Sequence, residues 1–251
     1  MAKTTLNYNL NFIDCISTLS PITPQLIFKK VADAESGENI ISVKANDVTR
    51  SLLYTLEAPE SYFNFAGENF ALLDYNKFAS YFNTFRPKDA SKAPLLSTEP
   101  DKDGEPHNVF INSQVSPAEI KQTLANIDVI SKPIFDNISA GSDDADFNFS
   151  DSQFAELKKM VGMIGADSAT YKVDGDIVTV TLFSKLSADR FVQQYKANKT
   201  AEDSFELTTT AKALTLIPDG GYHITIDKDG LVVFNQERKD DIKLSLYICE
   251  I

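Results

Sequence analysis

Residues 147–183 read FNFSDSQFAELKKMVGMIGADSATYKVDGDIVTVTLF, and this stretch says most about the secondary structure of the chain. It opens with Phe147 and Phe149 alternating with polar neighbours, which is the period of a half-buried strand. It closes with two runs rich in β-branched and aromatic residues, joined by an Asp-Gly-Asp turn at residues 174–176 that is typical of a β-hairpin. The stretch therefore predicts a strand, a helix and a hairpin in that order.

The helix in the middle of this stretch is predicted to be amphipathic. Asp151 or Ser152 is expected to cap its start, because a short polar side chain satisfies free backbone N–H groups there, and Gly165 is expected to end it. Four apolar positions follow the spacing of one buried stripe: Phe154, Leu157, Val161 and Ile164. Lys159 falls on the opposite face, among small and polar side chains, with Lys158 at its flank.

The same order of elements occurs twice along the chain. Residues 8–128 follow the succession of strands and helices that residues 147–251 follow, and such a repeat predicts two similar units. In the first half, one helix is expected from Tyr8 to Leu19. An apolar stripe indicates a second helix there: Tyr75, Phe78, Phe82 and Phe85. We expect an N-terminal domain at residues 1–130, a connector at 131–145 and a C-terminal domain at 146–251.

The chain is acidic, with 24 Lys and Arg against 36 Asp and Glu and a net charge of −12. This charge argues against uniform coating by nucleic acid but allows basic residues gathered on one surface. No apolar stretch approaches the roughly 20 residues that span a bilayer, and the N-terminus lacks the pattern of a signal peptide. We therefore expect a cytoplasmic protein with no membrane partner, in which Cys15 and Cys249 are free thiols.

No catalytic or metal-binding motif stands out, so the sequence predicts neither an enzyme nor a cofactor. Glycine-rich phosphate loops, a nucleophile elbow and an HExxH motif are all missing. His107 and His223 lie in no ligand-like spacing with the cysteines, and each is expected to be an ordinary histidine. The acidic run at residues 143–146 lacks the glycine and terminal glutamate of an EF-hand loop, so a solvated linker is the better interpretation.

Basic side chains recur on the predicted helices of both halves. They are Lys77, Arg86 and Lys88 in the first half, and Lys158, Lys159 and Lys212 in the second. A single lysine on a helix is ordinary solvent cover. A functional interpretation rests on the repetition, which lets several weak signals converge on one surface.

The chain resembles a known family, the DNA polymerase sliding clamps. The two-domain trimeric clamps of tailed phages are the most similar in organisation, and PCNA is a more distant likeness. Four segments carry the resemblance: residues 147–183, SFELTTTAKALTLIPDGGYHITI at 204–226, FALLDYNKFASYF at 70–82, and SKPIF at 131–135. The likeness covers nearly the whole chain at the level of pattern.

The resemblance implies an α+β fold of two similar DNA-clamp domains, with antiparallel sheets outside and two helices per domain on the inner face, forming a ring. Three subunits would encircle duplex DNA without sequence preference, and the six basic residues above would face it: Lys77, Arg86, Lys88, Lys158, Lys159 and Lys212. The first helix departs from this pattern, because it holds Asp14 and neither Lys nor Arg.

The resemblance also implies protein partners, namely a DNA polymerase tethered for processive synthesis and a clamp loader that opens the ring. A partner peptide is expected to dock beside the connector and the last strand: Ile134, Phe135, Ile138, Tyr247 and Ile248. The homotrimer is expected to join by edge-strand pairing, with the strand from Asp189 to Lys196 on one side. A phage-encoded clamp would act in the cytoplasm of the host cell.

Two other functions are compatible with the sequence. A phage tail or baseplate protein would explain acidity, oligomerisation and the lack of catalytic residues. A carbohydrate-binding or ligand-binding β module is the second alternative. Neither predicts a basic ring interior, so an image of the oligomer separates them from a clamp.

Overall fold

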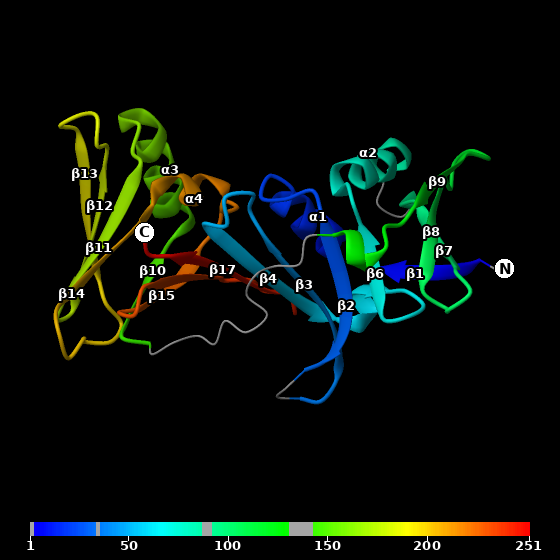
Figure 1. The fold of residues 1–251 in the computed structure, drawn as a ribbon, viewed down its shortest axis with the longest axis horizontal. Coiled ribbons are helices and arrows are strands. Elements are labelled where there is room, and N and C mark those ends of the chain that lie inside the picture. The colour runs from blue at the N-terminus through cyan, green and yellow to red at the C-terminus, as the bar shows by residue number, and fades with distance from the viewer. Residues whose placement is uncertain (1–2, 34–35, 87–91, 131–142) are drawn as a thin grey trace. The chain divides into compact units, whose positions relative to one another are not determined.

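The computed structural model describes residues 3–33, 36–86, 92–130 and 143–251 (Figure 1). The chain divides into two compact units: unit 1 comprises Met1–Ala45 and Leu56–Pro133, and unit 2 comprises Asn46–Thr55 and Ile134–Ile251. In the described part of the chain, no helix combines the length and the apolar character that crossing a bilayer requires.

The described part of unit 1 contains two antiparallel sheets and two α-helices. Its elements in chain order are β1 (Thr4–Tyr8), α1 (Leu10–Leu19), β2 (Leu26–Ala32), β3 (Asn39–Asn46), β4 (Leu52–Pro59), η1 (Glu60–Tyr62), β5 (Phe63–Asn64), β6 (Asn69–Leu72), α2 (Tyr75–Phe85), β7 (Leu95–Pro100), β8 (Pro106–Asn112), β9 (Glu119–Thr123) and η3 (Ile127–Val129). The residues of β4 are shared between the units. One sheet has the order β5-β1-β7-β8-β9, and in the other β2 pairs with β3 and β6.

The core of unit 1 is an aromatic cluster between its helices and sheets. Phe12 of α1 is fully buried and lies within 6.3 Å, centroid to centroid, of Phe28 and Phe63. The two helices are joined by the Tyr75 hydroxyl, which donates a hydrogen bond to the Ile13 carbonyl oxygen at 3.1 Å. The hydrophobic stripes thus hold α1 and α2 side by side on the sheets.

The start of α1 differs from the prediction. Tyr8 is the last residue of strand β1, and the helix begins at Leu10. The Asn9 side chain caps it by accepting a hydrogen bond from the Asn11 N–H at 2.8 Å. The spacing of Tyr8 fitted the helical stripe, but a good N-cap one residue later fixes the boundary.

Unit 2 has the same architecture. Its elements are β10 (Ala145–Phe149), α3 (Asp151–Ile164), β11 (Ser168–Asp174), β12 (Ile177–Phe183), β13 (Arg190–Lys196), β14 (Phe205–Thr210), α4 (Ala211–Leu216), β15 (Tyr222–Asp227), β16 (Leu231–Gln236) and β17 (Lys243–Cys249). The β10-β15-β16-β17 strands form one ladder, and β13-β12-β11-β14 form a second sheet. The hairpin predicted around residues 174–176 is confirmed, because Asp174 pairs with Ile177 across Gly175, whose φ is 63°.

Helix α3 is confirmed over its predicted length, but its cap is a different residue. Ser150, not Asp151 or Ser152, accepts a hydrogen bond from the Gln153 N–H, and the Gln153 side chain bonds back to the Ser150 N–H in a capping box. Gly165 ends the helix with a φ of 59°. Phe154, Leu157 and Val161 are buried, and Ile164 is half-buried.

The two units repeat one topology. Element by element, β1 corresponds to β10, α1 to α3, β2 to β11, β3 to β12, β6 to β14, α2 to α4, β7 to β15, β8 to β16 and β9 to β17. In each unit two helices lie together against antiparallel sheets (Figure 1). The predicted α+β class with two helices per domain is therefore confirmed.

Candidate nucleic-acid interface

The outward face of α3 is as the sequence predicted. Ser152, Ala155, Lys159 and Gly162 are all exposed, while Phe154 and Leu157 on the other side are fully buried. Lys159 has Ala155 and Gly162 as small neighbours on this face, with the exposed Glu156 and Met163 beside them. A lysine in this setting can contact a phosphate without disturbing the core.

Lys158 has a different environment from the exposed one expected at the helix flank. Its ammonium donates hydrogen bonds to the Ile217 carbonyl oxygen at 2.8 Å and to Asp219 Oδ1 at 2.6 Å. The side chain is only 21% exposed and its nitrogen lies 5.7 Å from the centre of the Phe154 ring. Lys158 therefore joins α3 to the segment that follows α4, and its charge is partly neutralised by Asp219.

Arg86 is also paired. Its two terminal nitrogens contact the two carboxylate oxygens of Asp14 at 2.5 and 3.0 Å, which is a bidentate bridge from the end of α2 to α1. Hydrogen bonding to Asp14 raises the pKa of the Arg86 guanidinium above its ordinary value. The acidic residue that set α1 apart in the sequence is thus the partner of a candidate DNA-facing residue.

The two ion pairs are related by the repeat. Each joins the first helix of a unit to the residue or segment that follows the second helix, and the sign of the charges is reversed between the units. Asp14 on α1 is the acid in unit 1, whereas Lys158 on α3 is the base in unit 2. In both units the bridge fixes one helix of the pair against the exit of the other.

Three of the six predicted basic residues keep an open side chain. Lys77 on α2, Lys159 on α3 and Lys212 on α4 are exposed, and no salt bridge among the described residues involves them. The Lys77 ammonium lies 5.8 Å from the centre of the Tyr81 ring. Lys88 lies outside the described residues. The candidate interface therefore has Lys77, Lys159 and Lys212 as its exposed charges.

The residues predicted to hold a partner peptide are only partly described. Ile134, Phe135 and Ile138 lie outside the described residues. Tyr247 is half-buried on β17, and Ile248 on the opposite face of the strand is fully buried. Ile248 therefore packs within its own unit, and Tyr247 is the described residue of this set that a peptide can reach.

Among the strands that end a sheet, β13 and β9 have one described neighbour each. β13 pairs with β12, and β9 pairs with β8. Val192 in the middle of β13 is 57% exposed. The strand predicted from Asp189 to Lys196 is thus present, begins at Arg190 and lies at the edge of its sheet.

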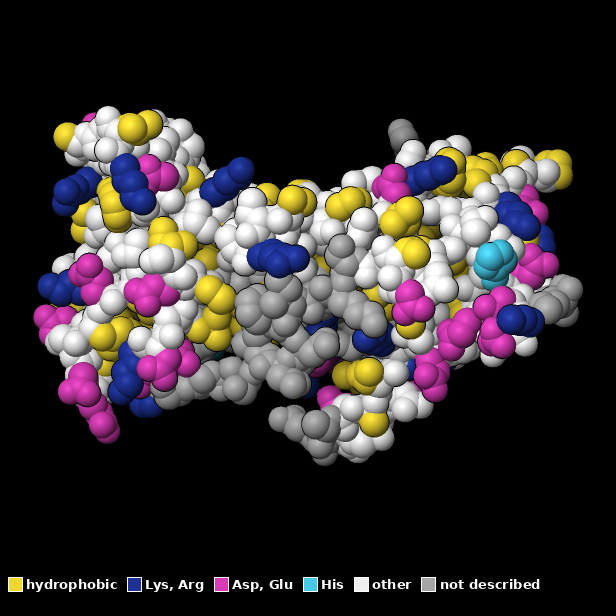
Figure 2. Space-filling model, viewed as in Figure 1, with side chains coloured by type: hydrophobic (Ala, Val, Ile, Leu, Met, Phe, Trp, Pro, Cys, Tyr) yellow, Lys and Arg dark blue, Asp and Glu magenta, His cyan; other side chains and the backbone are white. Residues whose placement is uncertain are grey.

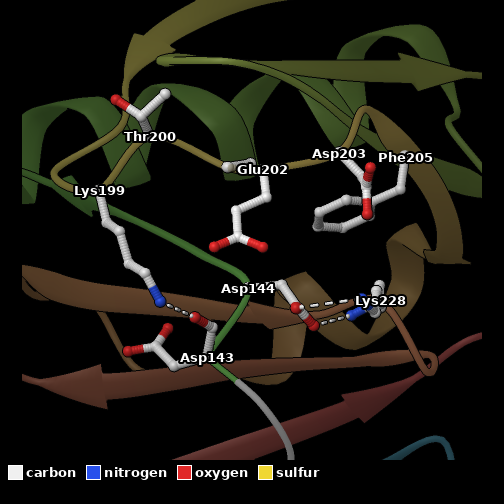
Figure 3. Close-up of a pocket in the computed structure, with 9 residues that line it drawn as sticks. Asp143, Asp144, Lys199, Thr200, Glu202, Asp203, Phe205 and Lys228 are labelled. Carbon is white, nitrogen blue, oxygen red and sulfur yellow. Dashed lines mark hydrogen bonds and ion pairs between the residues drawn. The ribbon is translucent and has the colours of Figure 1, made fainter.

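The acidic run at residues 143–146 is held by basic and polar neighbours within unit 2 (Figure 3). The Asp143 carbonyl oxygen accepts a hydrogen bond from Lys199 Nζ at 2.8 Å, and Asp144 Oδ2 accepts one from the Lys228 N–H at 3.0 Å. Asp146 accepts one from Asn198 Nδ2 at 3.0 Å. These contacts fasten the chain as it enters β10, and no metal-holding group of His, Cys, Asp and Glu occurs among the described residues.

Comparison with known proteins gives a result at the level of the fold. No protein-family model matches the sequence, and no curated protein matches it. Many solved structures match, and among them are three that are each similar along nearly the whole length of the chain. PCNA from Entamoeba histolytica has a TM-score of 0.72 and 13% identity, with 99% of this chain and 98% of that chain covered.

The other two are archaeal. PCNA from Thermococcus kodakaraensis has a TM-score of 0.69 and 14% identity, with 100% of both chains covered. A structure of the C-terminal region of FEN-1 bound to A. fulgidus PCNA gives a TM-score of 0.70 and 10% identity, with 100% of this chain and 98% of that chain covered. This chain therefore has the fold of PCNA, a sliding clamp, from end to end.

Proposed function

We propose that this chain is the subunit of a homotrimeric sliding clamp that encircles duplex DNA and tethers a DNA polymerase for processive synthesis. It performs no catalysis of its own. Its partners are duplex DNA, the polymerase and a clamp loader, and its place of action is the cytoplasm, that of the host cell if a phage encodes it.

The observation that carries this proposal is the likeness to PCNA over the whole of both chains. A likeness confined to one unit would support only a shared domain. Here both repeated units and their order are matched over the whole of both chains.

The charge distribution fits a protein that slides. Lys77, Lys159 and Lys212 project from three helices of a chain whose net charge is −12. Phosphate contacts by exposed lysines carry no sequence information, and a ring needs only weak contacts because its closure retains the DNA. The acidic remainder keeps other surfaces off the phosphate backbone.

The two sheet edges offer a means of assembly. An edge strand has unpaired N–H and C=O groups, and proteins cover or pair such edges. We propose that β13 of one subunit pairs with β9 of the next, so that three subunits close without a free edge at either strand. The exposed Val192 would then be covered by the neighbouring subunit.

The protein partners would dock through short peptides, and one of the matched structures holds the C-terminal region of FEN-1 bound to A. fulgidus PCNA. Tyr247, with Ile134, Phe135 and Ile138 of the connector, remains our proposed contact set. Ile248 would support this surface from beneath.

Imaging of the purified oligomer, combined with light scattering, tests the proposal. We expect a mass of three chains and a closed ring with a hole wide enough for duplex DNA. A monomer at micromolar concentration, or an oligomer without a central hole, would contradict it. The second outcome would favour the tail or baseplate alternative.

A further inference from the structure

Unit 1 contains a hollow that the proposed DNA, polymerase-peptide and subunit contacts do not use. Its volume is about 420 Å³, within the range of about 300–1,000 Å³ that is usual for ligand pockets. Three segments form its walls: the strand β6, the β7–β8 turn with the start of β8, and residues 124–128. We call it the acidic hollow.

The walls of the acidic hollow are fixed by hydrogen bonds within the unit. The Glu105 carboxylate accepts from the backbone N–H groups of Glu68 and Asn69 at 3.0–3.2 Å. The Ala125 N–H donates to the Ala71 carbonyl oxygen at 3.0 Å. The hollow is therefore formed before any ligand arrives, which lowers the entropic cost of binding.

The floor of the hollow is apolar. Ala71, Pro106 and Leu124 are buried, and Ala125 and Ile127 above them are only half-buried. Ala125 and Ile127 pack against the small core cluster that contains Ala71. An apolar side chain of a ligand could pack here, because the protein's own side chains leave part of this apolar surface uncovered.

The rim carries one sign of charge. Asp101, Asp103, Glu105 and Asp128 line the hollow, none of its described lining residues is Lys or Arg, and no salt bridge in the described part of the chain involves these four carboxylates. Acidic side chains gather in a band on this unit in Figure 2, with a histidine and a basic side chain beside them.

A hollow in unit 2 provides the contrast (Figure 3). It also has four lining carboxylates, from Asp143, Asp144, Glu202 and Asp203, but Lys199 and Lys228 lie among them. Their charges are offset inside the site, and both lysines are already bonded to the chain entering β10. The acidic hollow of unit 1 has no such internal neutralisation.

From the apolar floor and the single-signed rim we infer that the acidic hollow binds a basic segment of a partner protein that carries one or two apolar side chains. The rim repels phosphate, which excludes DNA as the occupant. The inference rests on the proposed function only in expecting a protein partner.

Binding of short labelled peptides to the full-length protein tests the inference, measured by fluorescence anisotropy at low and high salt. The probe is Lys-Lys-Leu-Phe-Lys-Arg. One matched peptide replaces its apolar pair by two serines, and another replaces its basic residues by glutamates. We expect the probe to bind most tightly, the serine peptide weakly and the glutamate peptide not at all, with affinity falling as salt rises.

The test variant is Asp103→Asn with Asp128→Asn, because both side chains are exposed and neither makes a described side-chain hydrogen bond that holds the fold. Its matched control is Glu202→Gln with Asp203→Asn in the other hollow. We expect the test variant to bind the probe about fivefold more weakly, the size expected for two rim ion pairs, and the control to bind it as the wild type does.

Three results would overturn the inference: equal affinity of the wild type for all three peptides, undiminished binding by the test variant, or an equal loss in the control. Self-association that the test variant abolishes would assign the hollow to a second copy instead. Because the assay contains no DNA, a peptide result of either sign leaves the ring and DNA test of the proposed function independent.

Discussion

Lys158 and Lys159 are neighbours on α3, and the structure assigns them opposite roles that two single substitutions can separate. Lys158→Met removes the ammonium but keeps an unbranched side chain over Phe154. The Ile217 carbonyl oxygen and Asp219 then lose their donor. Hydrogen bonds to charged groups contribute roughly 1.5–3 kcal/mol. Because Asp219 is 81% exposed, we place the net loss lower, at about 1–2 kcal/mol.

Thermal unfolding measures this difference. A loss of that size lowers the midpoint temperature by roughly 3–6 °C for a domain of this length. Lys159→Met lies on the exposed face, makes no described side-chain hydrogen bond and should change stability by at most about 0.5 kcal/mol. Lys159→Met should instead weaken DNA binding. Each lysine that neutralises a phosphate contributes a slope of about 0.9 to the dependence of log K on log salt concentration, so the slope should fall by as much as about 2.7 in a trimer.

The two variants together separate a stabilising role of Lys158 from a DNA-binding role of Lys159. Equal shifts of the unfolding temperature in the two variants would refute the assignment of Lys158 as the helix-joining residue. An unchanged salt slope for Lys159→Met on a short duplex would refute the placement of α3 against DNA. A double variant that combines the two losses additively would agree with independent roles.

Two further predictions concern local structure. Ser150→Ala removes the capping box of α3 and should cost about 1 kcal/mol, read from the same thermal melts. Ser152→Ala loses only an exposed hydroxyl that lies 3.2 Å from that of Ser150 and should cost clearly less, so equal effects would show that the cap lies elsewhere. Burial by itself would raise the pKa of Asp47, but hydrogen bonds from Thr49, Leu52 and Ser51 outweigh it and hold the pKa below its usual value. The ionised form of Asp47 therefore stabilises the fold above the unfolded-state pKa of about 4. This stabilisation is lost as the pH falls through the folded-state pKa. Asp47→Asn should therefore flatten the decline of the melting temperature below about pH 4, and an unchanged decline would contradict this assignment.

The sequence predicted best those elements whose determinants are local. The stripe of Phe154, Leu157 and Val161 placed α3, because helical spacing and burial of one face are properties of neighbouring residues. The turn at residues 174–176 placed the β11–β12 hairpin for the same reason, since its glycine supplies the positive φ that the turn needs. The repeat then allowed one half of the chain to support the interpretation of the other.

The boundaries of the helices depended on competition between neighbouring residues for the cap position. Asp151, Ser152 and Ser150 are all good cap residues, and the choice of Ser150 follows from Gln153, whose side chain completes the capping box three residues later. Strand β1 was not predicted as a strand, and Tyr8 was assigned to the helix. Tyr8 instead donates its hydroxyl hydrogen bond to the Pro94 carbonyl oxygen, 86 residues away, and its ring lies against Phe82. Contacts at that separation override the local helical spacing.

The candidate interface shows why counting charges on helices overstates a binding surface. Arg86 and Asp14 are 72 residues apart, and Lys158 and Asp219 are 61 residues apart, so neither pair is visible in the periodicity of any single helix. Both pairs arise only when two helices and the chain that leaves the second of them are brought together.

The same repetition that suggested a basic surface also produced these two bridges, with opposite polarity, so it argues for helix positioning at Arg86 and Lys158 as much as for DNA contact. A sliding surface needs charges that are free to follow a moving phosphate, and a lysine bonded to a carbonyl and a carboxylate at once does not meet that need. Lys77, Lys159 and Lys212 do, and a ring that repeats them in each subunit would hold DNA by many weak contacts, while Arg86 and Lys158 keep the helices that present them in place.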